Sequence, residues 1–275
     1  MKTDSQLPAM PAEASDSQLP SASGVGCMDL LEHPARIVAL SGGKDSTAMA
    51  LELAEREPSN DYQFCITPTK RELPAMDAHW AKLEKHLGKP LVRIPAPSLV
   101  ELIIKFKTLP NWRMRFCTRL IKIEPFMAYA EKLKPAISYV GIRADEVIGN
   151  DPREGTDWSG KDGVKQDFPM VRWGWGLSKV LAYLKERDMM PPPRTDCDWC
   201  FFQRLIEWYE LWRDHPDRYN EGIAIEKWTG HTFRSDQRDS WPASMEELAK
   251  CFAAGRVPKE TRGRERKTMC SWCAR

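Results

Sequence analysis

Residues 39–50 read ALSGGKDSTAMA, with two glycines, a lysine, an aspartate and a serine between an apolar run and an alanine-rich one. Glycine lets a backbone approach a ligand closely, and the N–H groups at the start of a helix favour anions. Lys44 adds positive charge, whereas Asp45 would repel phosphate unless it caps the helix or holds Mg²⁺. An ordinary glycine turn capped by Ser46 is the alternative. The turn predicts a phosphate site formed by Ser41, Gly42, Gly43, Lys44, Asp45 and Ser46.

Four of the eight cysteines form two Cys-x-x-Cys pairs. The two-residue spacing lets both sulfurs of a pair bind one metal, and two pairs provide four ligands for Zn²⁺ or a 4Fe-4S cluster. A redox dithiol or a disulfide in either pair is the alternative. The predicted metal ligands are Cys197, Cys200, Cys270 and Cys273.

Cations gather around one further cysteine and after one predicted strand. Arg115, Arg119 and Lys122 surround Cys117 in sequence, and positive neighbours lower a thiol pKa and favour the thiolate. We therefore expect Cys117 to carry sulfur or attack an intermediate, with packing as the alternative. Arg143 follows a predicted strand, where a guanidinium group suits phosphate or sulfate oxygens. A solvated cationic surface is the alternative for these residues.

Alternating patterns predict the elements that position these groups. Strands are expected over residues 36–41, 62–67, 91–94 and 137–142, and helices over 46–57, 74–87, 98–107 and 123–133. Such alternation is typical of an α/β fold, a Rossmann-like parallel sheet with helices on both faces. Ligands of such sheets bind at the carboxyl ends of strands, where residues 41–46 lie.

Changes in amino-acid composition along the chain predict three parts. Residues 1–28 form a disordered tail of Ser, Ala, Pro and Asp, in which Met28 is an alternative start. Residues 29–190 form a nucleotide-binding domain, and residues 191–275 form a small, mainly helical, Trp- and Cys-rich unit that binds the metal.

The composition excludes several classes of protein. Forty-one basic and 39 acidic residues leave a net charge of +2, which gives no general attraction to nucleic acid or anionic lipid. No apolar stretch could cross a bilayer, and the first residues lack the pattern of a secretion signal. We therefore expect a cytoplasmic protein without a membrane partner. The basic stretch at residues 256–267 is a solvated loop or a local contact for a phosphodiester backbone.

The first turn resembles the PP-loop, Ser-Gly-Gly-x-Asp-Ser, of enzymes that cleave ATP between the α and β phosphates, and the ATPase P-loop pattern is absent. Further motifs follow in the order seen in the phosphoadenosine phosphosulfate (PAPS) reductase family of PP-loop (adenine nucleotide alpha-hydrolase-like) enzymes. The resemblance spans about residues 36–226. These motifs are TKRELPAMDAHWAKLEKHLGKPLVRI, RFCTRLIKIEP, YVGIRADE and FPMVRWGWGLSKVLAYL.

The resemblance implies an enzyme that uses ATP and Mg²⁺, adenylylates an acceptor and transfers sulfur. A nucleic acid or a sulfur-donor protein is the implied partner. Asp145 and Glu146 would position magnesium or the cationic residues. Lys44, Asp45, Cys117 and Arg143 are the implied catalytic residues. Besides residues 41–46, the implied nucleotide ligands are Glu72, Arg119, Lys122, Gly141 and Arg143.

The sequence also departs from known members of this family. The Glu-Cys-Gly-x-His string of PAPS reductases is absent, and the Cys-Cys pair of adenylylsulfate reductases is replaced by Cys-x-x-Cys. Thiol-dependent reduction of PAPS or adenylylsulfate is therefore the alternative activity, and a non-catalytic, metal-bound nucleotide-binding module is another. Cysteine-bound clusters in sulfur-transferring PP-loop relatives and DNA phosphorothioation enzymes favour iron over zinc.

Overall fold

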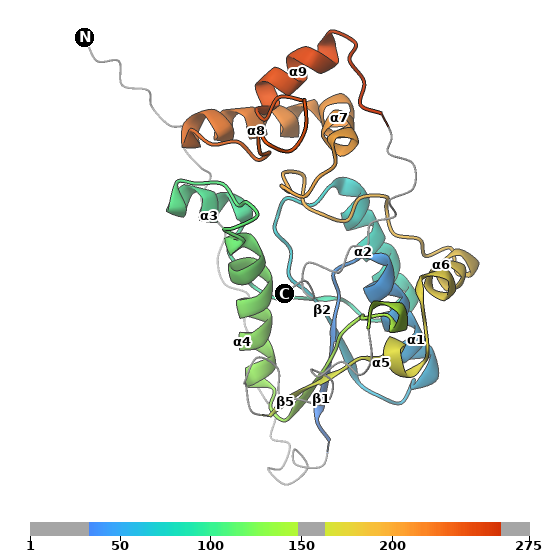
Figure 1. Cartoon of the computed structure of the whole chain (residues 1–275). Coiled ribbons are helices and arrows are strands. Elements are labelled where there is room, and N and C mark those ends of the chain that lie inside the picture. Colours follow the sequence, from blue (N-terminus) through green and yellow to red (C-terminus); the bar gives the residue numbers. More distant parts are fainter. Residues whose placement is uncertain (1–32, 148–162, 260–275) are drawn as a thin grey trace. The chain divides into compact units, whose positions relative to one another are not determined.

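A parallel sheet forms the centre of the molecule. The computed structural model describes residues 33–147 and 163–259, and the chain from Pro34 onward is one compact unit. Five parallel strands follow the order β3-β2-β1-β4-β5, which confirms the predicted α/β fold (Figure 1). The strands are β1 Ala35–Ala39, β2 Tyr62–Ile66, β3 Val92–Arg93, β4 Ala136–Tyr139 and β5 Val164–Asp167.

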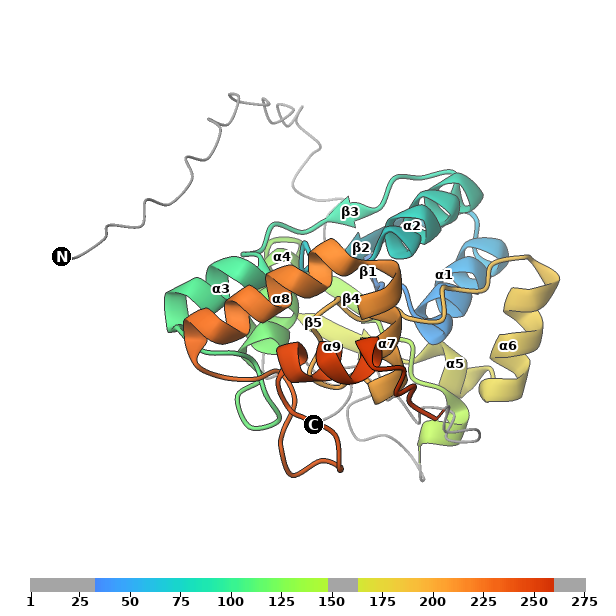
Figure 2. The ribbon, with the colours of Figure 1, turned by 90° about the horizontal axis from the view of Figure 1, so that it is seen from above.

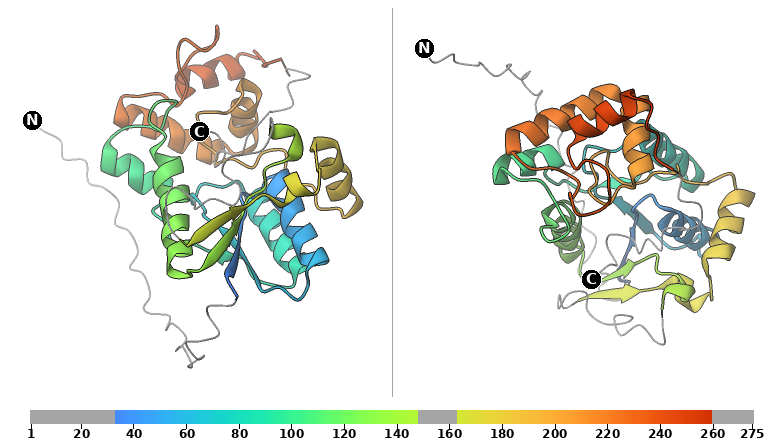
Figure 3. Two further views of the ribbon diagram at one scale, coloured as in Figure 1. Left: turned by 60° about the horizontal axis from the view of Figure 1, so that its bottom comes forward. Right: turned by 45° about the horizontal axis from the view of Figure 1, so that its top comes forward.

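Helices cover both faces of the sheet because alternate residues of β1 point to opposite sides. Val38 packs with α1, α2 and α6, whereas Ile37 packs with Phe126 of α4 on the other face. Figure 3 shows α4 and α1 on opposite sides of the sheet. The helices are α1 Lys44–Arg56, α2 Pro74–Leu87, α3 Leu99–Phe106, α4 Glu124–Lys132, α5 Pro169–Arg172, α6 Leu177–Glu186, α7 Leu205–Asp214, α8 Pro216–Thr229 and α9 Met245–Ala253, with a π-helical turn η2 Thr118–Ile123 and a 3₁₀ turn η3 Ala144–Glu146.

Local sequence explains where several helices begin and end. Pro74 stands in the first turn of α2, and Gly88 ends that helix with a left-handed φ of +64°. In α3, the Ser98 side chain accepts the N–H of Glu101, whose carboxylate accepts the N–H of Ser98. The helix α2 thus spans the predicted residues 74–87, with Pro74 at its start and Gly88 just after its end.

The C-terminal helices share a hydrophobic core with α3. Trp208 of α7 and Tyr219 of α8 are fully buried and belong to one cluster with Leu102 of α3. Figures 1 and 2 show α8 beside α3. This core joins residues that precede residue 190 with residues that follow it. The predicted domain boundary at residue 190 stays a prediction.

Other predictions differ from the structure in detail. The strand β4 ends at Tyr139 rather than at residue 142, and α1 begins at Lys44 rather than at residue 46. The strand β5 was not expected, since its four residues VKQD include only one apolar side chain. The predicted tail at residues 1–28 lies outside the described residues. No helix within residues 33–147 and 163–259 is long and apolar enough to span a membrane.

Candidate functional site

The turn between β1 and α1 lies at the carboxyl end of the central strand. Gly43 precedes the first helical residue with an extended backbone, and no side chain caps the helix. The Ser41 and Ser46 hydroxyls lie 3.0 Å apart, and the Ser41 hydroxyl accepts the N–H of Gly43 at 3.3 Å. Ser46 therefore closes the turn, and the alternative that it caps the helix does not apply.

The start of α1 presents free backbone donors. Thr47 donates its N–H to the carbonyl of Gly43 at 3.0 Å. Within the described part of the chain, no acceptor takes the N–H groups of Lys44, Asp45 and Ser46. Unpaired donors at a helix start, together with the helix dipole, form an anion-binding arrangement. The Lys44 side chain is 23% exposed and adds a positive charge there.

Two glycines stand where side chains would not fit. Gly42 has a φ of +76°, and a Cβ there would clash with the Met76 methyl group and lie 2.7 Å from Trp80 Nε1. Gly141, just beyond β4, approaches the start of α1 so closely that its Cβ would lie 3.1 Å from the backbone of Ser46. The turn is therefore held between α2 and the end of β4.

Arg143 follows β4 and is bound by three carboxylates. Its Nη1 lies 2.9 Å from Asp45 Oδ2, its Nε lies 2.9 Å from Asp145 Oδ1, and its Nη2 lies 3.1 Å from Glu146 Oε1. Burial acts to lower the pKa of Arg143, but the carboxylates outweigh it and raise the pKa. Asp145 and Glu146 thus position a cationic residue, and Arg143 in turn orients Asp45.

Asp45 carries one oxygen that this network does not satisfy. Its Oδ1 is buried and has no hydrogen-bond partner among residues 33–147 and 163–259. A buried carboxylate oxygen without a partner is unfavourable, so this atom fits a cation that arrives with a ligand. Carboxylate and phosphate oxygens together are the ligands that Mg²⁺ prefers.

Glu72 organises the loop that follows β2. Its Oε1 accepts the N–H of Thr69 at 2.6 Å and the Thr69 hydroxyl at 2.8 Å. Its carbonyl accepts Arg218 Nη1 at 2.8 Å. The carboxylate is therefore used within its own loop, next to the start of α2.

Cys117 and its cations differ from the expectation. Burial and, after it, the neighbouring Cys200 raise the pKa of Cys117, and Lys122 offsets this only in part. The prediction that cations favour a Cys117 thiolate is therefore wrong, because desolvation outweighs their charge. Arg119 is 66% exposed and lies 3.5 Å from Glu124 Oε1, and Arg115 stacks 5.3 Å over Phe202.

Cys197 and Cys200 form a compact two-thiol turn. The N–H of Cys200 donates to the carbonyl of Cys197 at 3.2 Å. The neighbouring Cys200 thiol, together with burial, raises the pKa of Cys197. Among the described residues, no group of three or more His, Cys, Asp or Glu could hold a metal ion. The second pair, Cys270 and Cys273, lies outside the described residues, so the four-cysteine site stays a prediction.

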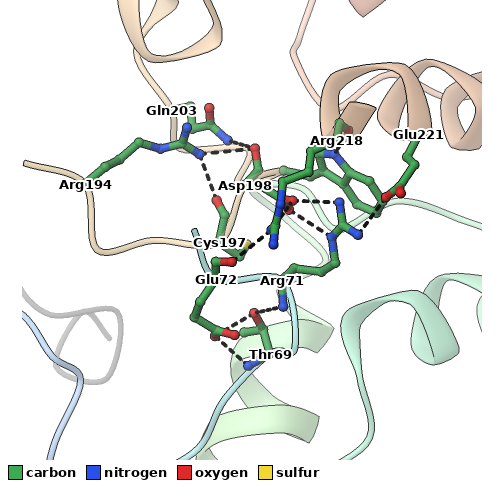
Figure 4. A network of polar contacts seen from close by, with 10 residues as sticks. Thr69, Arg71, Glu72, Arg194, Cys197, Asp198, Gln203, Arg218 and Glu221 are labelled. Atoms are coloured by element: carbon green, nitrogen blue, oxygen red, sulfur yellow. Dashed lines mark hydrogen bonds and ion pairs between the residues drawn. The ribbon is translucent and has the colours of Figure 1, made fainter. Parts of the chain in front are cut away.

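An ion-pair network fixes this turn to the loop after β2 (Figure 4). The Asp198 carboxylate is fully buried, 2.6 Å from Arg71 Nη2 and 3.0 Å from Arg218 Nη1. The Arg71 guanidinium group also stacks 3.8 Å over the Trp199 ring, and the backbone carbonyl of Arg71 accepts the N–H of Asp198. Arg194 donates to the carbonyls of Cys197 and Asp198.

The sequence analysis did not identify Arg71, Asp198 or Arg218 as parts of the site. Asp198 stands inside a Cys-x-x-Cys pair, and Arg71 stands next to Glu72, so proximity to a motif was the one available signal. A contact across 127 residues leaves no periodic pattern in a single sequence.

Residues 35–193 match the phosphoadenosine phosphosulfate reductase domain family. Among solved structures, the chain is similar to PAPS reductase from Candida auris in a phosphate complex, with 16% identity and a TM-score of 0.45 over 58% of this chain and 76% of that chain. It is also similar to the U34-tRNA thiolase NcsA from Methanococcus maripaludis with its 4Fe-4S cluster, with 16% identity and a TM-score of 0.43 over 84% of each chain. No curated protein matches the sequence.

Proposed function

The chain belongs to the phosphoadenosine phosphosulfate reductase domain family, and on this premise we propose that it is an enzyme that cleaves ATP at the α phosphate. Attack by an acceptor oxygen on the α phosphorus breaks the bond to the bridging oxygen, releases pyrophosphate and leaves an adenylylated acceptor. Adenylylation makes that oxygen a leaving group, so sulfur can replace it. The unpaired N–H groups at the start of α1, beside Lys44, carry this proposal.

The proposal gives each part of the site a role. The N–H groups of Lys44, Asp45 and Ser46 bind phosphate oxygens, and the Lys44 ammonium balances their charge. Mg²⁺, when bound, supplies charge neutralisation of the phosphates, and Asp45 Oδ1 is its fitting ligand. Arg143 keeps Asp45 in place, and Gly141 keeps the start of α1 close to the sheet.

The cysteines form the second part of the proposed enzyme. Cys197 and Cys200, which share one hydrogen-bonded turn, provide two thiol ligands that suit Zn²⁺ or a 4Fe-4S cluster. Cys270 and Cys273 complete the set of four in this proposal. Zinc would stabilise the fold, whereas a cluster would also supply iron for sulfur chemistry.

The activity is tested with the full chain, Mg²⁺ and ATP, in the presence of single-stranded nucleic acid and a sulfide donor. We expect pyrophosphate release, and we expect Lys44→Ala to weaken ATP binding about 10- to 100-fold, as for a lost hydrogen bond to a charged group. Lys85→Ala, at the exposed end of α2, is the matched control and leaves ATP binding unchanged. Absence of pyrophosphate release, with the same ATP affinity for Lys44→Ala and wild type, contradicts the proposal.

The thiol pair favours one alternative. Oxidation of Cys197 and Cys200 to a disulfide would provide two electrons for reductive release of sulfite from PAPS or adenylylsulfate. Sulfite formation from these nucleotides, without pyrophosphate release from ATP, identifies that activity. Tight ATP binding without either product identifies a non-catalytic nucleotide-binding module.

A further inference from the structure

The segment that follows α3 combines cations with exposed apolar side chains and contains no acidic residue. Trp112 is 72% exposed, and Met114 and Phe106 are 47% and 40% exposed. Large side chains usually leave water on folding, so their exposure beside cations indicates a binding surface. Between Glu101 and Glu124 the cations are Lys105, Lys107, Arg113, Arg115, Arg119 and Lys122.

The aromatic and cationic side chains of this segment contact one another in a fixed arrangement. Trp112 meets Phe202 edge to face with ring centroids 4.9 Å apart, and Arg115 lies 5.3 Å over the Phe202 ring. The Asn111 side chain accepts the N–H of Arg113 at 2.9 Å and so fixes the backbone beside the indole. We call the surface around Trp112, Arg115 and Phe202 the cation–aromatic patch. We include in it Arg113, which follows Trp112, and Phe106 and Lys107, which precede it in sequence.

The charges of Lys107 and Arg113 are available to a partner. Among the residues that the structure describes, no carboxylate lies within ion-pair distance of Lys107 or Arg113, whereas Arg119 pairs with Glu124. The chain has a net charge of only +2, so attraction to a polyanion must come from such a local surface. Phe202 stands two residues after Cys200, and the patch therefore adjoins the two-thiol turn.

We propose that the cation–aromatic patch binds a single-stranded nucleic acid, with a base stacked on Trp112 and phosphates paired with Lys107 and Arg113. A flat exposed indole between cations matches the alternation of bases and phosphates along an unpaired strand. An acidic protein segment would use the cations but would not require a stacking surface. The inference deepens the proposed function, since a strand bound here would be the acceptor of the adenylyl group.

The binding test uses the full chain without ATP and two fluorescein-labelled 20-nucleotide strands of one sequence, one RNA and one DNA. Fluorescence anisotropy is measured over a range of salt concentrations. We expect both strands to bind, because every base can stack. Trp112→Ala weakens binding about tenfold, and Trp112→Phe keeps most of the affinity because phenylalanine also stacks. The double variant Lys107→Ala with Arg113→Ala makes the slope of the logarithm of the binding constant against the logarithm of the salt concentration less negative by about 1.4, or about 0.7 per phosphate contact.

Matched control variants stand on other elements. Trp228→Ala removes another exposed tryptophan, 54% exposed, from α8, and Lys85→Ala with Lys185→Ala removes two exposed cations from α2 and α6. Both controls are expected to bind like the wild type. Equal affinity of wild type, Trp112→Ala and the double variant overturns the proposal. Equal binding of a labelled poly-glutamate peptide that is insensitive to Trp112→Ala also overturns it and indicates an acidic protein partner.

The binding test and the pyrophosphate assay together distinguish a failure of this inference from a failure of the proposed function. Strand binding without pyrophosphate release from ATP supports the patch and contradicts the proposed reaction. Pyrophosphate release that continues unchanged in Trp112→Ala, without strand binding by the wild type, supports the reaction and overturns the patch. Binding of RNA alone or DNA alone supports the patch and identifies which of the two strands it accepts.

Discussion

At the scale of single residues, the conformation of Gly42 decides whether the turn between β1 and α1 can form. Its left-handed φ of +76° is unfavourable for any residue with a Cβ, and Met76 and Trp80 occupy the space in which that atom would stand. The unpaired backbone donors at the start of α1 therefore depend on the conformation of Gly42.

We expect Gly42→Ala to lower the free energy of unfolding by about 2–4 kcal/mol, because backbone strain and a steric clash add together. Gly88→Ala isolates the strain, since Gly88 has a φ of +64° and no atom within 4 Å of its Cβ position. That control is expected to lose only about 1–2 kcal/mol and no ATP affinity. Urea unfolding and ATP titration measure both quantities, and equal losses for the two variants would rule out the clash.

The sequence singled out residues 41–46 of the turn between β1 and α1 but not their partners. Ser41 to Ser46 are contiguous and follow an apolar run, so one short string contains the signal. The ion pair of Asp45 with Arg143 joins residues 98 positions apart, and no local pattern contains it. Cys117 was misjudged for the same reason, because neighbours in sequence indicated cations and only the fold showed its burial.

At the scale of elements, the pattern of apolar residues predicted most of the sheet. The strands β1 and β2 are apolar runs beside clear helices, and both were expected at nearly their observed positions. The strand β5 was missed because it lies at the edge of the sheet, where one neighbour suffices and polar residues are tolerated. Strand order was also beyond prediction, since it depends on which crossovers the chain makes.

Helices α1 and α2 are joined by a buried polar contact that predicts a pH dependence. His79 of α2 is 5% exposed, and its Nε2 lies 3.2 Å from the Thr47 hydroxyl of α1. Burial, with a smaller effect of Lys82, lowers the pKa of His79 to about 4. The folded protein therefore keeps this imidazole neutral.

Below pH 6.5 the unfolded chain binds a proton at His79 that the folded chain does not bind, so stability falls as the pH drops from 6.5 towards 4. The full contribution of the neutral His79 imidazole to the free energy of unfolding, up to about 3 kcal/mol, is present above pH 6.5. We expect His79→Gln to remove this part of the pH dependence in urea unfolding at pH 7 and pH 4.5. His86→Gln, at an exposed position of the same helix, is expected to follow the wild-type profile. Parallel profiles of His79→Gln and wild type would contradict the assignment.

At the scale of the whole molecule, the hydrophobic core extends beyond the family match. The match ends at residue 193, yet Leu102 of α3 shares a cluster with Trp208 and Phe252. The change of composition after residue 190 indicated Trp-rich helices, and the structure has α7, α8 and α9 there. Composition does not show which surface those helices cover.

The proposed metal centre would connect residue 197 with residue 270 and so would stabilise the whole chain. We expect anaerobically purified protein to contain either zinc or iron, with a broad absorption band near about 400 nm in the case of iron. Cys197→Ser is expected to lose the metal and to unfold at a lower temperature, because metal binding is linked to folding. Cys251→Ser, in α9, is the matched control. Equal metal content in both variants, measured by elemental analysis, would contradict the assignment.

The buried Asp198 carboxylate limits which segments of this protein can be exchanged with those of another family member. Its two guanidinium partners come from the loop after β2 and from α8, on either side of the residue at which the family match ends. A chimaera that joins residues 194–259 to the sheet of another family member would leave this anion with only Arg218, unless the donor loop supplied an arginine at the place of Arg71. Arg71 and Asp198 should therefore be inherited, exchanged or lost as a pair.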